Sequence, residues 1–141
     1  MSSEEQQRGV ALFNEVWRLM ETREDDDRLL HAAHASRFHW GEAPECGPEH
    51  RARGEWQISR VYAVLGRAEP AVWHARRSLE HCERAGLGDW DLAYAYEALA
   101  RAHALAGSAE AAEWKAKACA AGDAIADPED REHFEEDYAT L

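Results

Sequence analysis

The sequence predicts an all-α protein built from stacked antiparallel helix hairpins, with about seven helices and a C-terminal capping helix. Three observations indicate this fold class. Apolar residues recur at steps of three and four along most of the 141 residues, no segment alternates as a strand does, and one stretch of sequence is repeated. The length suits one domain with a hydrophobic core, so we expect a single domain over residues 1–141.

The first hairpin is predicted from its periodicity and its turn. Residues 4–23 form a helix with one apolar face, on which Leu12, Val16 and Met20 are spaced by four residues. The acidic segment REDDDR should make a turn in which Asp27 or a neighbour caps a second helix, running through LLHAAHASRFHW. The segment GEAPECGPE, with its prolines and glycines, is the clearest loop.

The remaining helices are separated by glycines and by one proline. Gly66, Gly86 and Gly107 indicate helix ends, and Asp127 followed by Pro128 is a strong start signal. The expected helices are residues 49–65, 69–84, from Asp89 or Asp91 to 106, from the cap Ser108 to about 122, and 127–141.

The repeated stretch indicates how the hairpins are arranged. RVYAVLGRAEPAVWHARR, residues 60–77, recurs 41 residues later as RAHALAGSAEAAEWKAKA, residues 101–118. Each unit also carries a large apolar residue, a small residue and a ring at matching places: Ile58, Ser59 and Tyr62 in one, Leu99, Ala100 and His103 in the other. Small residues allow helices to approach closely, and large residues fill the gaps beside them.

This pattern resembles the tetratricopeptide repeat. The resemblance implies a right-handed superhelix of stacked hairpins, with best-matching units at about 49–86 and 89–122, a looser unit at 4–40 and a capping helix at 127–141. The capping helix should lay Phe134, Tyr138 and Leu141 over the last hairpin. We also expect Trp17, Trp73 and Trp114 to lie mostly in the core, and Trp90 to lie at the rim of the ligand groove.

Composition excludes several classes of function. The net charge of −12 repels phosphate backbones, which argues against nucleic acid as a partner. No apolar run approaches the length of a membrane span, so no membrane partner is expected. The start MSSEEQQRG does not resemble a secretory signal, and Cys46, Cys82 and Cys119 lack the pattern of a disulfide framework. We therefore expect a cytoplasmic protein with reduced thiols.

Two stripes of side chains are the candidate ligand-binding residues. Helical geometry places Arg53, Trp56 and Arg60 on the side of their helix away from the core. Tyr94, Glu97 and Arg101 form the matching stripe of the other unit, and the resemblance implies that both stripes line a concave groove. Arginine binds carboxylate or phosphate in a bidentate manner, and aromatic rings supply apolar contact. The expected partner is an acidic peptide segment or small anionic ligand, with no cofactor; alternatively, the stripes only form solvated salt bridges.

The histidines suggest an alternative site. In HAAHASRFHW, His34 and His39 lie on one broad helix face beside Phe38 and Trp40, which implies a partly buried environment, whereas His31 should face solvent. With Glu55 or Glu97 they could hold a transition metal or act as acid and base, as in a metal-dependent sensor or small enzyme. The i, i+4 pair of a helical metal site is missing, which favours the interpretation of each histidine as a polar packing residue bonded to backbone or carboxylate.

Neither an enzyme class nor an oligomeric state is fixed by a motif. The chain contains no GxSxG, HExxH, phosphate-binding loop or dinucleotide fingerprint. A short array of hairpins has exposed end faces, so association into a homodimer is a further possibility.

Overall fold

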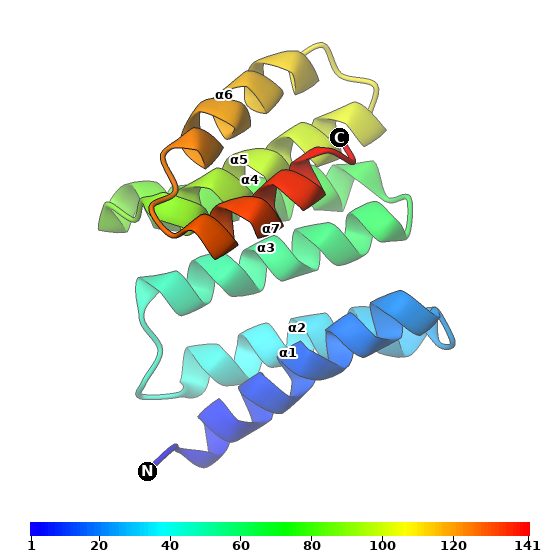
Figure 1. Ribbon diagram of the computed structural model, residues 1–141. Helices are drawn as coiled ribbons and strands as arrows, with labels where there is room; N and C mark the ends of the chain where they lie inside the picture. The colour runs from blue at the N-terminus through cyan, green and yellow to red at the C-terminus, as the bar shows by residue number, and fades with distance from the viewer.

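The computed structural model describes all residues 1–141, and it is entirely α-helical apart from turns. The seven helices are α1 Glu4–Thr22, α2 Asp26–Glu42, α3 Pro48–Val64, α4 Ala68–Ala85, α5 Asp89–Leu105, α6 Ala111–Asp123 and α7 Pro128–Tyr138. The pairs α1 with α2, α3 with α4 and α5 with α6 form hairpins that stack on one another (Figure 1). The predicted fold class is confirmed. None of the helices combines the length and hydropathy needed to cross a bilayer.

The helix ends follow the signals in the sequence. Gly66, Gly86 and Gly107 all have positive φ angles, of 75°, 65° and 69°, in the left-handed region that glycine adopts most easily. The cap of α2 is Asp25, whose carboxylate accepts a hydrogen bond from the Arg28 amide. Helix α6 begins later than expected, because Ser108 starts a turn, rather than the helix itself.

Three apolar clusters make the core, one at each level of the stack. Val16, Leu19, Leu29, Ile58 and Val61 are buried between α1, α2 and α3. The second cluster, between α3, α4 and α5, is made largely of alanines with Leu79, Cys82 and Leu99, and the third gathers around Phe134 of α7. The small residues allow close helix packing, as expected from the repeat.

Buried serine hydroxyls join the two helices of the first and of the second hairpin. Ser36 of α2 donates to the Gly9 carbonyl of α1 at 2.7 Å, and Ser59 of α3 donates to the Ala71 carbonyl of α4 at 2.8 Å. In the reverse direction, Ser78 of α4 donates to the Ala52 carbonyl at 2.9 Å. Each bond satisfies a buried hydroxyl that would be costly to leave without a partner.

Trp73 corrects one expectation about the core, because its side chain is 55% exposed. It lies two residues after the buried Ala71, or about 200° around the helix, and therefore points away from α3. The core positions of α4 are occupied by small residues instead. Trp17 and Trp114 are half-buried.

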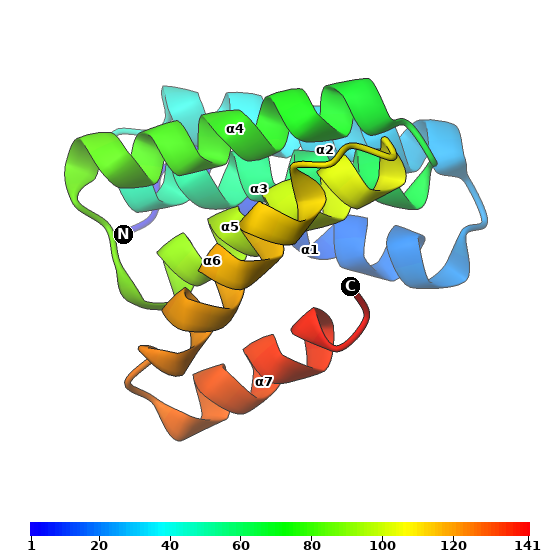
Figure 2. The same cartoon turned by 90° about the horizontal axis from the view of Figure 1, so that it is seen from above.

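Helix α7 packs against α5 and α6, so the prediction of a C-terminal capping helix is confirmed. Phe134 is fully buried there, and its ring lies where a Cβ on Gly122 would be only 3.1 Å away. Figure 2 shows α7 on the side of the array opposite to α2 and α4. This placement brings the acidic end of the chain against α5 and within 3.9 Å of Arg60 of α3.

Candidate functional site

The two predicted stripes lie on neighbouring helices, α3 and α5, on the side where α7 packs. Tyr94 bonds to Asp137 of α7, Arg60 approaches the same carboxylate, and Arg101 reaches Thr140 just beyond α7. We call this surface the arginine face and define it by the six predicted residues: Arg53, Trp56, Arg60, Tyr94, Glu97 and Arg101. The structure brings them together, but it does not leave them all open.

Glu97 is the buried centre of the arginine face. Its side chain is fully inaccessible, and Oε1 accepts a hydrogen bond from Nε of Arg101 at 2.8 Å and lies 2.6 Å from Nη2 of the same guanidinium. Nη1 of Arg60 lies 3.5 Å from the same oxygen, whereas Oε2 has no partner. Burial raises the pKa of Glu97, although the charges of Arg101 and Arg60 oppose that change. The expectation of an open stripe residue is therefore corrected for Glu97.

Tyr94 is also covered rather than exposed. Its hydroxyl donates to Asp137 at 2.8 Å, and its ring meets Phe134 edge to face, with the centroids 5.0 Å apart. The reason is the position of α7, which lies across this part of α5. As a result, Tyr94 holds α7 in place and does not form an open wall of a groove.

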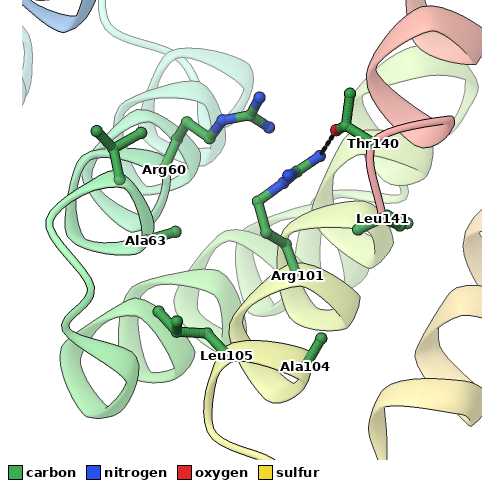
Figure 3. A pocket seen from close by; sticks show the side chains of 8 residues that line it. Arg60, Ala63, Arg101, Ala104, Leu105, Thr140 and Leu141 are labelled. Carbon is green, nitrogen blue, oxygen red and sulfur yellow. Dashed lines mark hydrogen bonds between the residues drawn. The ribbon is translucent and has the colours of Figure 1, made fainter.

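Arg101 is similarly committed to contacts within the chain. Besides Glu97, its Nη2 atom donates to the Asp137 carbonyl at 3.1 Å and to the Thr140 hydroxyl at 2.6 Å. Figure 3 shows the bond from Arg101 to Thr140, and it shows Arg60 and Arg101 extending from neighbouring helices toward the same space. Arg101 therefore ties the last turn of the chain to α5.

Arg53 is held at the far end of the arginine face. It forms a bidentate pair with Asp91, at 2.9 and 3.1 Å, and its guanidinium lies 4.4 Å from the ring centroid of Trp90. Such a stacked, bidentate arrangement fixes the side chain in one geometry. Trp90 thus packs at the edge of the face, as its expected rim position suggested.

Arg60 differs from the other two arginines because its guanidinium makes no direct hydrogen bond within the chain. The two nearest carboxylate oxygens, on Glu97 and Asp137, lie at 3.5 and 3.9 Å. The side chain remains 20% exposed. Its donors are therefore available to a group that arrives from outside.

Two open cavities meet at Arg60. One, of about 350 Å³, lies between α3, α5 and the chain end and includes Ala63, Leu105 and Leu141. The other, of about 500 Å³, lies between α1, α3 and α7 and is lined by Trp17, Met20, Glu21, Trp56, Arg60, His133 and Asp137. Arginine, carboxylates and aromatic rings therefore surround one accessible space.

The aromatic wall of the larger cavity continues into the core. The ring of Trp56 lies 5.4 Å from Trp17 and 5.2 Å from Tyr94, measured between centroids. The Trp56 indole N–H is buried and has no acceptor within the chain. Such unpartnered donors are uncommon in native proteins. Trp17 and the contacts from α7 were not among the predicted site residues, because they depend on how distant helices pack.

The histidine alternative is not assembled as a metal site. His34 contacts the Tyr62 hydroxyl at 2.9 Å, whereas His39 contacts Glu5 of α1. Glu55 binds Arg37 and His74, and Glu97 lies within the arginine face. The structure contains no group of three or more histidine, cysteine, aspartate or glutamate side chains that could hold a metal ion.

The surroundings of these histidines also differ in part from the expectation. His31 faces solvent, as expected, with 79% of its side chain exposed. Phe38 is exposed as well, and so is His34, so the partly buried environment expected for His34 is wrong, whereas His39 is half-buried. Phe38 lies on the side of α2 away from the core helices.

The fold and the site together define a class: an all-α protein of stacked hairpins with one arginine-rich, aromatic-lined face. No protein-family model, curated protein or solved structure matches the chain. The assignment of a function therefore depends on the geometry of this face.

Proposed function

We propose that the protein is a tetratricopeptide-like binding module whose arginine face recognises an acidic peptide segment or a small anionic ligand. The observation that carries the proposal is the position of Arg60, between two open cavities and without a hydrogen bond of its own. A guanidinium with free donors beside aromatic rings is well suited to bind a carboxylate on a peptide.

Helix α7 supports this choice of ligand. It is an acidic helix, and it already places the carboxylate of Asp137 on Tyr94 and near Arg60. The face is thus chemically compatible with an acidic segment. An external segment would use the larger cavity beside α7, where Arg60 and the rings of Trp17 and Trp56 are accessible together.

The members of the face would then have different roles. Arg60 binds the anionic group, while Trp56 and Trp17 supply apolar contact. Glu97 lies within 3.5 Å of Arg60 and holds Arg101, so it positions both guanidinium groups. Arg53 is neutralised by Asp91 and would contribute through its packing on Trp90.

The test uses the full chain and a panel of short peptides rich in Asp and Glu, each with one aromatic residue. Binding is followed by the indole NMR signals of Trp17 and Trp56 during titration. We expect saturable shifts in the wild type and a loss of affinity of about tenfold or more in Arg60→Gln, because one charged hydrogen-bonding group is removed.

Arg76→Gln is the matched control. Arg76 is exposed on α4 and forms no ion pair, so its loss should leave both binding and melting temperature unchanged. If Arg60→Gln folds normally and binds the peptides as tightly as the wild type, or if no peptide shifts the two indole signals, the proposal is wrong.

A further inference from the structure

The opposite side of the array carries a second charged cluster, centred on Glu55 of α3. Glu55 is only 4% exposed, yet three basic side chains reach its carboxylate. Arg37 of α2 donates from Nε at 2.9 Å, His74 of α4 lies at 2.9 Å through Nδ1, and Nε of Arg77 lies at 3.4 Å. Two flanking helices therefore converge on one buried anion.

The cluster is formed by side chains from α2, α3 and α4. His34 of α2 bonds to Tyr62 of α3, and its ring centroid is 5.5 Å from that of His74. Tyr62 also stacks on His74, with centroids 5.6 Å apart and an interplanar angle of 15°. Side chains from three helices thus meet along one line, which we call the α2–α4 furrow.

Helical geometry places Arg51 and His81 in the same furrow. Arg51 precedes Glu55 by one turn of α3, and His81 follows Arg77 by one turn of α4. The pKa of His81 is lowered first by burial and then by the charge of Arg37, which lies across the furrow on α2. Arg77 and Arg51 lower it further.

Most of the basic donors in the furrow are not used by the fold. Arg37 and Arg77 both turn Nε toward Glu55, and their terminal amino groups make no hydrogen bond within the chain. Arg51 forms no ion pair, and Nε2 of His74 has no partner. Donors from α2, α3 and α4 are therefore free to bind an acceptor.

The charge of the furrow is opposite to that of the whole protein. Two arginines contact the single carboxylate there, and Arg51 lies one turn before it on α3, in a chain with a net charge of −12. Burial raises the pKa of Glu55, but the bond to His74 and the charges of His74, Arg37 and Arg77 outweigh it and hold the pKa below its usual value. Glu55 is therefore ionised and holds the arginines in position, while the furrow keeps an excess of positive charge.

Two exposed aromatic side chains flank this furrow. Phe38 of α2 is 62% exposed and Trp73 of α4 is 55% exposed, and Arg77 lies 5.0 Å from the Trp73 ring centroid. Trp73 lies beside both Arg77 and His74, and Phe38 follows His34 by one turn of α2. They can contact an apolar portion of a molecule whose anionic group lies between the helices.

We propose that the α2–α4 furrow binds a phosphate group, with Arg37, Arg51 and Arg77 as its principal ligands and His74 as an additional donor. Arginine forks match the oxygens of phosphate, and several of them around a dianion form strong charge-assisted hydrogen bonds. This site lies on the face opposite to the arginine face, and it is independent of the function proposed for that face.

Proton uptake should accompany binding. The pKa of His34 is lowered by burial and by His74, and that of His81 by burial and by Arg37. The groups that act on these histidines are His31 and Arg37 from α2, Arg51, Glu55 and Tyr62 from α3, and His74 and Arg77 from α4. A bound dianion would favour the charged imidazoles, so the affinity for the dianion itself, after allowance for the protonation of free phosphate in the same range, should increase as the pH falls from 8 to 6.

The first test is an NMR titration of the full chain with inorganic phosphate, at constant ionic strength maintained with chloride. We expect saturable shifts of the ring signals of His34, His74 and His81. His31 is solvent-facing and its charge acts on His34, so its signal should shift less than that of His34; His133 reports separately on the cavity beside Arg60. Absence of saturable shifts at the three furrow histidines would overturn the proposal.

The second test uses Arg51→Gln, because Arg51 has no partner in the fold and its loss should not alter the melting temperature. We expect the affinity for phosphate to fall about tenfold in this variant, and to remain unchanged in Arg76→Gln. Equal affinities for phosphate in the two variants would contradict the assignment.

Free phosphate and a phosphate ester are the two possible sources of the bound group. Comparing inorganic phosphate with phenyl phosphate, in the wild type and in Trp73→Ala, separates them. Tighter binding of phenyl phosphate that is lost in Trp73→Ala identifies an ester, and equal affinities identify the free ion. Both of these results require phosphate to bind in the α2–α4 furrow. If neither probe binds there, the proposed phosphate site is wrong, and the separate test of Arg60 is unaffected.

Discussion

The hydroxyl of Tyr94 donates a hydrogen bond to the carboxylate of Asp137 across 2.8 Å, and this bond joins α5 to the C-terminal helix. Burial and, to a smaller extent, the hydrogen bond to Asp137 raise the pKa of Tyr94 above its ordinary value. The phenol therefore remains protonated and continues to donate. The same carboxylate lies near Arg60. One residue of α7 is therefore linked to both helices of the arginine face.

Tyr94→Phe and Asp137→Asn should each reduce the free energy of unfolding by about 1–3 kcal/mol, because a hydrogen bond to a charged group is lost. The ring of Tyr94 would keep its packing against Phe134 and Trp56. Urea denaturation of the two single variants and the double variant measures the coupling energy. Strictly additive effects would show that the bond makes no net contribution.

The two buried glutamates should contribute to the pH dependence of stability with opposite signs. The pKa of Glu97 is raised in the folded state, mainly by burial, so its contribution is fully present below its unfolded pKa and is lost as the pH rises through the folded value. Glu55 has a lowered pKa, so its contribution is present above the unfolded value and is lost as the pH falls through the folded value.

This difference can be measured with Glu97→Gln and Glu55→Gln. As the pH is lowered from 7 to 4, the free energy of unfolding of the wild type should rise relative to that of Glu97→Gln. As the pH is lowered further below about 4.5, the free energy of unfolding of the wild type should fall relative to that of Glu55→Gln. Denaturant titrations at each pH provide the values. If the free energies of unfolding of the two variants changed in parallel with pH, Glu97 and Glu55 would not have pKa values shifted in opposite directions.

The three cysteines should react with thiol reagents at very different rates. Burial and, to a smaller extent, the negative charge of Asp91 raise the pKa of Cys82 to about 12, whereas Cys119 is exposed. The thiolate is the reactive form, so alkylation in the folded state should modify Cys119 first and leave Cys82 intact. Peptide mass spectrometry before and after unfolding tests this order, and early modification of Cys82 would contradict its burial.

Two glycines in the first hairpin should respond oppositely to alanine. A Cβ on Gly9 would lie 2.6 Å from the ring of Trp40, so Gly9→Ala should destabilise the protein by about 1–3 kcal/mol. At Gly41 the nearest atom is the flexible end of Arg37, so Gly41→Ala should stabilise α2 by up to about 1 kcal/mol. Thermal unfolding measures both, and a stabilising Gly9→Ala would indicate a different packing of Trp40.

The number and order of the helices could be predicted from the sequence because local signals determine them. Periodic apolar residues, the glycines at 66, 86 and 107 and the Asp127–Pro128 start signal act within a few residues, and the structure confirms each. Helical geometry also placed Arg60 and Glu97 on the side away from the central core. These predictions require only the backbone geometry of one helix at a time.

The environment of the site residues could not be predicted in the same way. Glu97 faces the expected side, but α7 covers that side, and no local signal states where a distant helix docks. The acidic composition of the chain end was the only indication that it could meet arginines. Likewise, Glu55 was a candidate partner of His34, but the role of His74 depends on how three helices pack.

The serine bonds between hairpin partners bear on how the array can respond to a ligand. If α2 shifted by one turn along α1, the hydroxyl of Ser36 would lose the Gly9 carbonyl and stay buried without an acceptor. The same holds for Ser59 and Ser78 between α3 and α4. Longitudinal sliding within the first two hairpins is therefore expensive, so a molecule bound beside them must be accommodated by rotation of side chains such as Arg60 or Arg37, on helices whose register is fixed.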